Sequence, residues 1–194
     1  MYPLKLTMNK IFSLLLFFVT LLFFSCSTDQ TTVQIIRTPL LQFDFTPSNS
    51  WKADNYSISN TSKVVVYPQD TTLPAQLYDR YTLQGSGKDQ SGHTYQLVIT
   101  FDVSDNSQLV GIYKTGYTSQ RGLAQVQMFD LTNKNDLSVY NLCAEDIAND
   151  VLQIQKEKAD EKIITGAFQM TVCNSRDTTQ KLTIMNGTIK DLKY

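Results

Sequence analysis

A single histidine, His93, limits the chemistry that the side chains of this 194-residue chain could perform. A serine or cysteine nucleophile needs a positioned base, and His93 is the only imidazole that could serve. One histidine also cannot supply a multi-histidine zinc site. The sequence contains no G-x-S-x-G, G-x-x-x-x-G-K-[ST], H-E-x-x-H or C-x-x-C motif. We therefore expect a non-catalytic protein that uses no cofactor.

Carboxylates are the remaining candidates for catalysis, and several of them fall around one predicted hairpin. They are Asp130, Asp136, Glu145, Asp146 and Asp150. Two carboxyl groups at roughly 5–9.5 Å across a cleft could hydrolyse a glycoside. With Asn133 and Asn135, the same stretch is rich in the oxygen ligands that calcium prefers, but it lacks the glycine and final glutamate of an EF-hand loop. Acids and amides at turns are ordinarily solvated, so a glycan hydrolase remains an alternative and no metal site is expected.

Aromatic side chains could instead bind a ligand. Trp51 ends the polar stretch 47–51 and is predicted to be the most exposed aromatic residue, which makes it a candidate for ligand contact. A packed position over one end of the sheet is the alternative. Six tyrosines could form a stacking surface for sugars or line an apolar ligand site, although tyrosine is also a common strand residue. These are Tyr78, Tyr81, Tyr95, Tyr113, Tyr117 and Tyr140.

The first 26 residues carry the features of an export signal. Lys5 and Lys10 precede the apolar run Ile11–Phe24, whose fourteen residues would span roughly 21 Å as a helix, which is too short for a ~30 Å hydrocarbon core. A signal peptide fits better than a membrane span. The run ends in Ser25-Cys26, which resembles the lipobox of bacterial lipoproteins. The resemblance implies cleavage before Cys26 and acylation of its thiol; a non-lipidated secretory signal is the alternative.

These features predict the organisation of the chain. Residues 1–25 are expected to be a lipoprotein signal peptide, 26–33 a lipidated tether, and 34–194 one antiparallel β domain. Two cysteines then remain, Cys143 and Cys173, in a compartment that permits oxidation. A bridge between them would close a 31-residue loop and contribute roughly 3.5 kcal/mol in the chain-entropy model. Two separate buried thiols are the alternative.

Alternation of apolar and polar residues dominates the domain. In the stretch His93–Val103, every second residue is apolar and only Val98 interrupts the polar face, which predicts a half-buried strand. Similar stretches predict eight to ten short strands with connections of a few residues, and such connections join antiparallel neighbours. Asn186-Gly187 predicts a type I′ hairpin turn. The fold class is all-β, either a sandwich or a flattened up-and-down barrel, with a lipocalin-like barrel as the alternative and little helix.

The C-terminal third carries a further resemblance. Ile163–Met170 (IITGAFQM), followed by Leu182–Leu192 (LTIMNGTIKDL), resembles the ending of small lipoproteins of Bacteroidota that also have a lipobox and a β-rich body. Ile189 stands where an aromatic residue is usual in that pattern. Since these lipoproteins have no established activity, the resemblance implies a location and a fold and transfers no catalytic residue.

The net charge and the expected location limit the kinds of binding partner. The net charge is −1, and removal of residues 1–25 leaves 15 basic and 18 acidic side chains, or −3; no nucleic acid partner is expected from so weak a cationic surface. We expect an outer-membrane protein held by its lipid on the periplasmic face or at the cell surface. The leading hypothesis is a non-catalytic module that binds a glycan or an envelope protein. A lipocalin-like carrier of an apolar ligand and a carboxylate-dependent glycan hydrolase are the alternatives.

Overall fold

The computed structural model of the chain describes residues 37–46, 48–66, 76–104, 108–115, 123–133, 137–143 and 149–194. They contain ten strands: β1 (Leu40–Thr46), β2 (Asn49–Val66), β3 (Gln76–Asp89), β4 (Thr94–Ser104), β5 (Gly111–Thr115), β6 (Leu123–Asp130), β7 (Ser138–Leu142), β8 (Val151–Lys158), β9 (Ile163–Asn174) and β10 (Lys181–Lys193). The predicted all-β class and the predicted strand number are confirmed. The predicted signal peptide, the tether and Cys26 lie outside the described residues.

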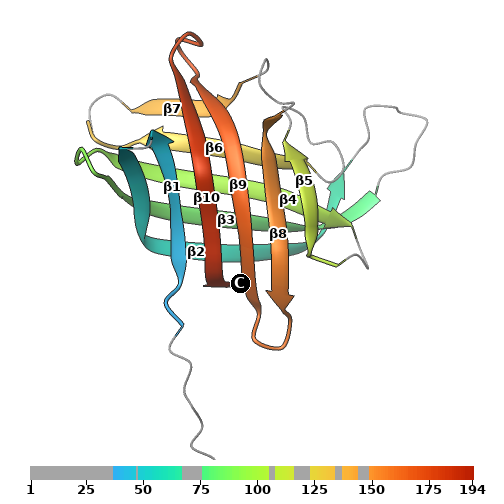
Figure 1. Cartoon of the computed structure of the whole chain (residues 1–194). Coiled ribbons are helices and arrows are strands. Elements are labelled where there is room, and N and C mark those ends of the chain that lie inside the picture. The colour runs from blue at the N-terminus through green and yellow to red at the C-terminus, as the bar shows by residue number, and fades with distance from the viewer. Residues whose placement is uncertain are drawn as a thin grey trace, which may run out of the picture. The chain divides into compact units, whose positions relative to one another are not determined.

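The strands form one closed, barrel-like sheet. Neighbours follow the order β10-β1-β2-β3-β4-β6-β5-β8-β9-β7, and additional pairings join β10 to β9 and β6 to β7. Figure 1 shows a flattened barrel, in which β1, β10, β9 and β8 run up and down in one layer while β2, β3, β4 and β6 cross behind them. This steep crossing is typical of orthogonally packed sheet layers. No helix in the described part of the chain is long and apolar enough to cross a membrane.

One pairing departs from the expected antiparallel pattern. β5 and β6 are parallel, with Lys114 beside Leu123 and Thr115 beside Ala124. The prediction that short connections join only antiparallel strands is therefore wrong at this point. The two strands overlap by only these two residue pairs, at the end of β5 and the start of β6.

The interior of the barrel is filled by apolar side chains. Alternate residues of each strand point inward, as β4 illustrates: Leu97, Ile99 and Phe101 are fully buried while the residues between them are partly exposed. Side chains from the strands around the barrel meet in one contiguous hydrophobic cluster. Burial of this kind contributes roughly 1.5–3 kcal/mol per large side chain, so the packed interior is the main source of stability.

Trp51 belongs to this interior, and the prediction that it is exposed is wrong. Its exposure is 0%, and its ring stacks on Phe43 with 4.7 Å between centroids. Phe43 and Trp51 are paired across β1 and β2, so both point to the same inner face. A Cβ at Gly85 would lie 3.3 Å from the Trp51 ring and 2.5 Å from Leu41. The absence of a side chain at Gly85 therefore makes room for the indole.

Asn186-Gly187 does not form the predicted hairpin turn, because both residues lie within the continuous strand β10. Asn186 has a φ of 52°, and the pairing with β9 shifts register between Ile184 and Gly187. A type I′ turn needs positive φ at two consecutive residues, whereas one such residue and a register shift make a β-bulge. A second bulge falls at Asp191, whose φ is 50°. The two bulges bend β10 around the barrel.

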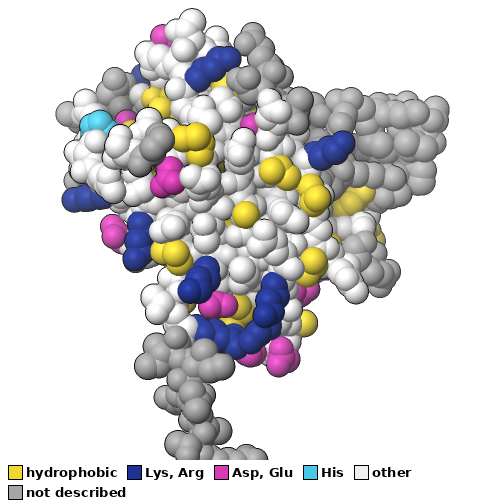
Figure 2. All heavy atoms as spheres, viewed as in Figure 1, with side chains coloured by type: hydrophobic (Ala, Val, Ile, Leu, Met, Phe, Trp, Pro, Cys, Tyr) yellow, Lys and Arg dark blue, Asp and Glu magenta, His cyan; other side chains and the backbone are white. Residues whose placement is uncertain are grey.

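The first described residue, Arg37, and the C-terminal residue, Tyr194, are both held at the lower end of the barrel in Figure 1. Arg37 makes a two-pronged contact with Glu161, with 2.9 Å from Nη2 to Oε1, and this hydrogen bonding lowers the pKa of Glu161. The backbone N–H of Tyr194 donates to the Lys162 carbonyl, and its hydroxyl donates to Glu157. Figure 2 shows Lys and Arg side chains gathered near this end, over the end of β10 and the β8–β9 hairpin.

Candidate functional site

A groove crosses the outer face of the sheet, and its volume is about 420 Å³. Its base is formed by outward-pointing residues of β4 and β6. Val98 and Thr100 come from β4, and Gln127 and Gln125 stand directly opposite them on β6. Directly opposed residues of antiparallel strands have Cβ atoms roughly 5 Å apart, so these four side chains form a compact patch.

The same row of residues continues across β7 and β9. Gln127 is paired with Asn141, and Asn141 is paired with Cys173. The Gln127 side-chain amide donates a hydrogen bond from Nε2 to Asn141 Oδ1 at 3.2 Å. The groove is also lined by Val126 and Leu142, which belong to the apolar core. It therefore reaches from the polar outer face down to the edge of the packed interior.

The position of the groove follows from a change of partner along β9. Residues 163–169 of β9 pair with β8, and residues 172–174 pair with β7. Between them the Thr171 N–H donates to the Asp150 carboxylate at 2.9 Å, and the Cys143 N–H donates to the Thr171 carbonyl at 3.0 Å. The buried Asp150 thus satisfies a backbone group where the regular ladder is interrupted.

A disulfide joins Cys143 to Cys173 at this same seam, with 5.1 Å between their Cα atoms. Both cysteines are buried, with exposures of 1% and 7%. Cys173 also lines the groove. The bond therefore ties the end of β7 to β9 and holds one wall of the groove in place.

The rim of the groove is a turn after β9, and hydrogen bonds hold it in one conformation. Ser175 and Thr178 line the groove from this turn. The Asn174 N–H donates to the Gln180 carbonyl at 3.0 Å, and the Ser175 N–H donates to the Val139 carbonyl at 2.8 Å. Asp177 accepts bonds from the Thr179 hydroxyl and N–H, which lower the pKa of its carboxyl group.

The described residues that line the groove carry no ionisable side chain. The nearest charged pair along β4 is formed by Asp102 with Arg80 of β3, through two hydrogen bonds of 2.8 Å. This bonding raises the pKa of the Arg80 guanidinium. Because each partner neutralises the other, the pair adds no net charge beside the groove.

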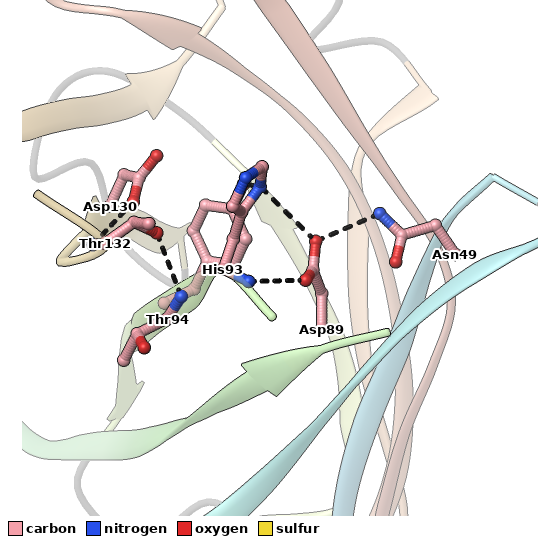
Figure 3. A network of polar contacts seen from close by, with 7 residues as sticks. Asn49, Asp89, His93, Thr94, Asp130 and Thr132 are labelled. Atoms are coloured by element: carbon pink, nitrogen blue, oxygen red, sulfur yellow. Dashed lines mark hydrogen bonds and ion pairs between the residues drawn. The ribbon is translucent and has the colours of Figure 1, made fainter. Parts of the chain in front are cut away.

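His93 lies elsewhere, in a turn that joins β3 to β4 (Figure 3). The buried Asp89 carboxylate accepts hydrogen bonds from the backbone N–H of His93 at 2.8 Å and from the Asn49 side-chain amide at 3.1 Å. The Nδ1 atom of the His93 ring lies 3.8 Å from the same carboxylate. The neighbouring Thr94 N–H donates to the Thr132 hydroxyl at 3.0 Å. Among the described residues, the imidazole contacts Asp89 and the Tyr95 hydroxyl and bonds to no serine or cysteine side chain. The network therefore stabilises the turn.

The structure does not bring the predicted acids together in the part of the chain that it describes. Asp150 is engaged with Thr171, and Asp130 accepts the Thr132 N–H at 2.9 Å. Asp136, Glu145 and Asp146 lie outside the described residues, as does Asn135 of the calcium alternative. Within the described ranges, no three His, Cys, Asp or Glu side chains are grouped so that they could hold a metal ion.

The tyrosines form no outer stacking surface among the described residues. Tyr78, Tyr81, Tyr95 and Tyr113 are buried at 8% exposure or less, Tyr140 is partly buried, and Tyr117 lies outside the described residues. Burial raises the pKa of Tyr95 and of Tyr113, whose hydroxyl donates to the Leu109 carbonyl at 2.7 Å. The interpretation of these four as core residues is therefore the correct one.

Comparison of the chain with models of protein families, with curated proteins and with solved structures finds no match. The alternation of apolar and polar residues puts Thr100, Gln125 and Gln127 on the polar faces of their strands, but it does not mark them as a site. One signal was present: Val98 is an apolar residue on the otherwise polar outer face of its strand, and it is part of the base of the groove.

Proposed function

We propose that this chain is an envelope lipoprotein, anchored through acyl groups on Cys26, whose barrel is a non-catalytic binding module. The observation that carries the binding role is the outer groove, a recess of about 420 Å³ with neutral polar walls. That volume lies within the range of small-molecule sites. The anchor is supported by the sequence alone: a basic start, a short apolar run and Ser25-Cys26.

The packed interior favours this proposal over a lipocalin-like carrier. A carrier holds its ligand inside the barrel, whereas fully buried side chains such as Trp51, Phe43 and Phe101 occupy the interior here. A carboxylate hydrolase would need two acids facing each other across a cleft. The described lining of the groove offers only amides, hydroxyls, apolar groups and a disulfide sulfur. Binding without catalysis is what this lining supports.

The anchor is tested by growing cells that express the full chain with an alkyne analogue of palmitate. We expect the label on the wild-type protein and on Cys143→Ala, and we expect Cys26→Ala to be unlabelled and released from the membrane fraction. Cys143→Ala is the matched control because it also replaces one cysteine by alanine. An unlabelled wild-type protein would refute the lipid anchor, and sedimentation with the inner membrane would refute the outer-membrane location expected from the sequence.

A further inference from the structure

We propose that the outer groove binds an uncharged, hydroxyl-rich ligand, namely a short neutral saccharide. This inference rests on the proposed binding role of the groove and specifies the chemistry of its ligand.

The lining selects against charged ligands. No described side chain that lines the groove is ionisable. The Arg80–Asp102 pair next along the face is already neutralised, and the Asp177 carboxylate of the rim turn accepts hydrogen bonds from Thr179 and Gln180. A carboxylate, phosphate or ammonium group entering the groove would lose water and find no opposite charge in the described lining. Such desolvation is costly unless the charge is paired, so a neutral ligand is favoured.

The lining also offers hydrogen bonds that the protein does not use itself. Among the described residues, the side chains of Thr100, Gln125, Ser175 and Thr178 line the groove and make no hydrogen bond within the chain. The bond from Gln127 Nε2 to Asn141 Oδ1 leaves the Gln127 oxygen, the second Gln127 N–H and both N–H groups of the Asn141 amide available. These groups include donors and acceptors. A sugar hydroxyl both donates and accepts, so it can satisfy such a mixed set.

An apolar strip accompanies the polar groups. Val98 is half-buried on the outer face, and Val126 and Leu142 are almost fully buried where they reach the groove. A sugar ring presents C–H groups on its faces and hydroxyls around its edge. The C–H groups can lie against Val98 and Leu142 while the hydroxyls reach the amides, which few purely apolar or purely polar ligands could do.

The groove is preorganised for binding. Its base comes from four neighbouring strands in one cross-strand row, Val98, Gln127, Asn141 and Cys173. The Cys143–Cys173 bond holds one wall, and backbone hydrogen bonds of 2.8 and 3.0 Å hold the rim at Ser175 and Asn174. Preorganisation of this kind lowers the ordering cost of binding, which matters for a ligand that makes only neutral contacts.

The test uses the full chain purified in a detergent without a sugar headgroup. The probes are uncharged disaccharides of glucose, galactose, mannose and N-acetylglucosamine, with uronic-acid disaccharides and a neutral Ser/Gln-rich peptide as comparisons. Binding is measured by saturation-transfer NMR and isothermal titration calorimetry. We expect at least one neutral disaccharide to bind and the uronic acids to bind at least tenfold more weakly.

Variants locate the site. We expect Gln125→Ala to weaken binding about tenfold, since two neutral hydrogen bonds contribute together on the order of 1.4 kcal/mol, and Gln125→Glu to abolish it by placing a charge in the groove. Gln155→Glu is the matched control, because Gln155 is exposed on β8 and does not line the groove. Equal binding by wild type and Gln125→Glu would overturn the assignment of the site but leave the binding role standing. Preference for the peptide or for uronic acids, or no binding by any disaccharide, would overturn the ligand class. The palmitate experiment reports separately on the anchor.

Discussion

The inner and outer faces of the same strands have different tasks in this barrel. Along β4, Leu97, Ile99 and Phe101 point inward and are fully buried. Val98 and Thr100 stand between them and form part of the base of the outer groove. Because side chains alternate across a sheet, one strand supplies the apolar core and the candidate site with alternate residues. Stability and binding should therefore respond to separate sets of substitutions.

The two faces also differ in how they are held together. The inner face is stabilised by close packing of aromatic and aliphatic side chains, such as Phe43 against Trp51 and Tyr81 against Phe101. The groove on the outer face relies on a disulfide, one buried carboxylate and a hydrogen-bonded turn, all at the seam where β9 changes partner. The contrast indicates that the site lies where the regular ladder of the sheet is interrupted and other local contacts hold the strands together.

The largest effect should come from removing Trp51. We expect Trp51→Ala to lower the free energy of unfolding by about 3–5 kcal/mol, since it leaves a cavity against Phe43 in a packed core. Urea titration followed by circular dichroism measures the change. Lys52→Ala is the matched control: Lys52 is the next residue of β2, exposed on the opposite face. A comparable cost for the two substitutions would contradict the division between faces.

Loss of the disulfide should come next. We expect Cys143→Ala with Cys173→Ala to lower the free energy of unfolding by roughly 3.5 kcal/mol, because the bond closes a 31-residue loop in the unfolded chain. The affinity of the groove should fall as well, since Cys173 lines it. Dithiothreitol should reproduce both effects in the wild type and change neither in the double variant. An unchanged groove affinity would show that the bond serves the fold alone.

The strands could be predicted from the sequence more reliably than the burial of individual side chains. Period-two alternation predicted β4, β6 and β9 because each buries one face. Trp51 was misplaced because its neighbours in 47–51 are polar, while its burial is set by pairing with Phe43 on another strand. The Asn186-Gly187 dipeptide predicted positive φ, and Asn186 has it, but the sequence does not distinguish a bulge from a turn.

The groove could not be predicted for a related reason. Its central row joins Val98, Gln127, Asn141 and Cys173, which become neighbours only through the registers of β4, β6, β7 and β9. Local pattern sets which face a residue occupies, whereas register sets which residues meet across strands. The apolar Val98 on a polar face was a hint of a site without any indication of its partners.

The free energy of unfolding should fall at high pH because of the buried tyrosines. Burial raises the pKa of Tyr95 and Tyr113 above the ordinary value of about 10. The folded state therefore retains protons that the unfolded chain releases. The stability that these groups contribute is complete below pH 10 and falls as the pH rises above it, by up to about 1.4 kcal/mol per tyrosine for each pH unit. Unfolding curves between pH 8 and 12 measure the slope, and Tyr95→Phe should make it shallower. A slope unchanged by Tyr95→Phe would exclude Tyr95 as a contributor.

A smaller effect is expected where the bulge of β10 meets the core. A Cβ at Gly187 would lie 2.5 Å from the Phe168 carbonyl oxygen and 2.5 Å from its ring. We expect Gly187→Ala to cost about 1–3 kcal/mol, because the backbone contact cannot be relieved by a side-chain rotation. Gly111→Ala is the control, since a Cβ there meets nothing within 4 Å, and it should change the free energy of unfolding by less than about 1 kcal/mol. Thermal denaturation of both variants provides the comparison.

The smallest change in stability should accompany a clear change in binding. Thr100→Val keeps the shape of a side chain that points into the groove and has no hydrogen-bond partner in the described part of the chain. We expect the free energy of unfolding to change by less than about 0.5 kcal/mol. The affinity for a bound neutral disaccharide should fall several-fold, because the hydroxyl that would meet the sugar is gone. Calorimetric titration and urea unfolding of the same sample separate the two quantities. If Thr100→Val instead lowered stability and left affinity unchanged, the outward-pointing residues of β4 would have a structural role. The division of β4 into inward residues for stability and outward residues for binding would then be wrong.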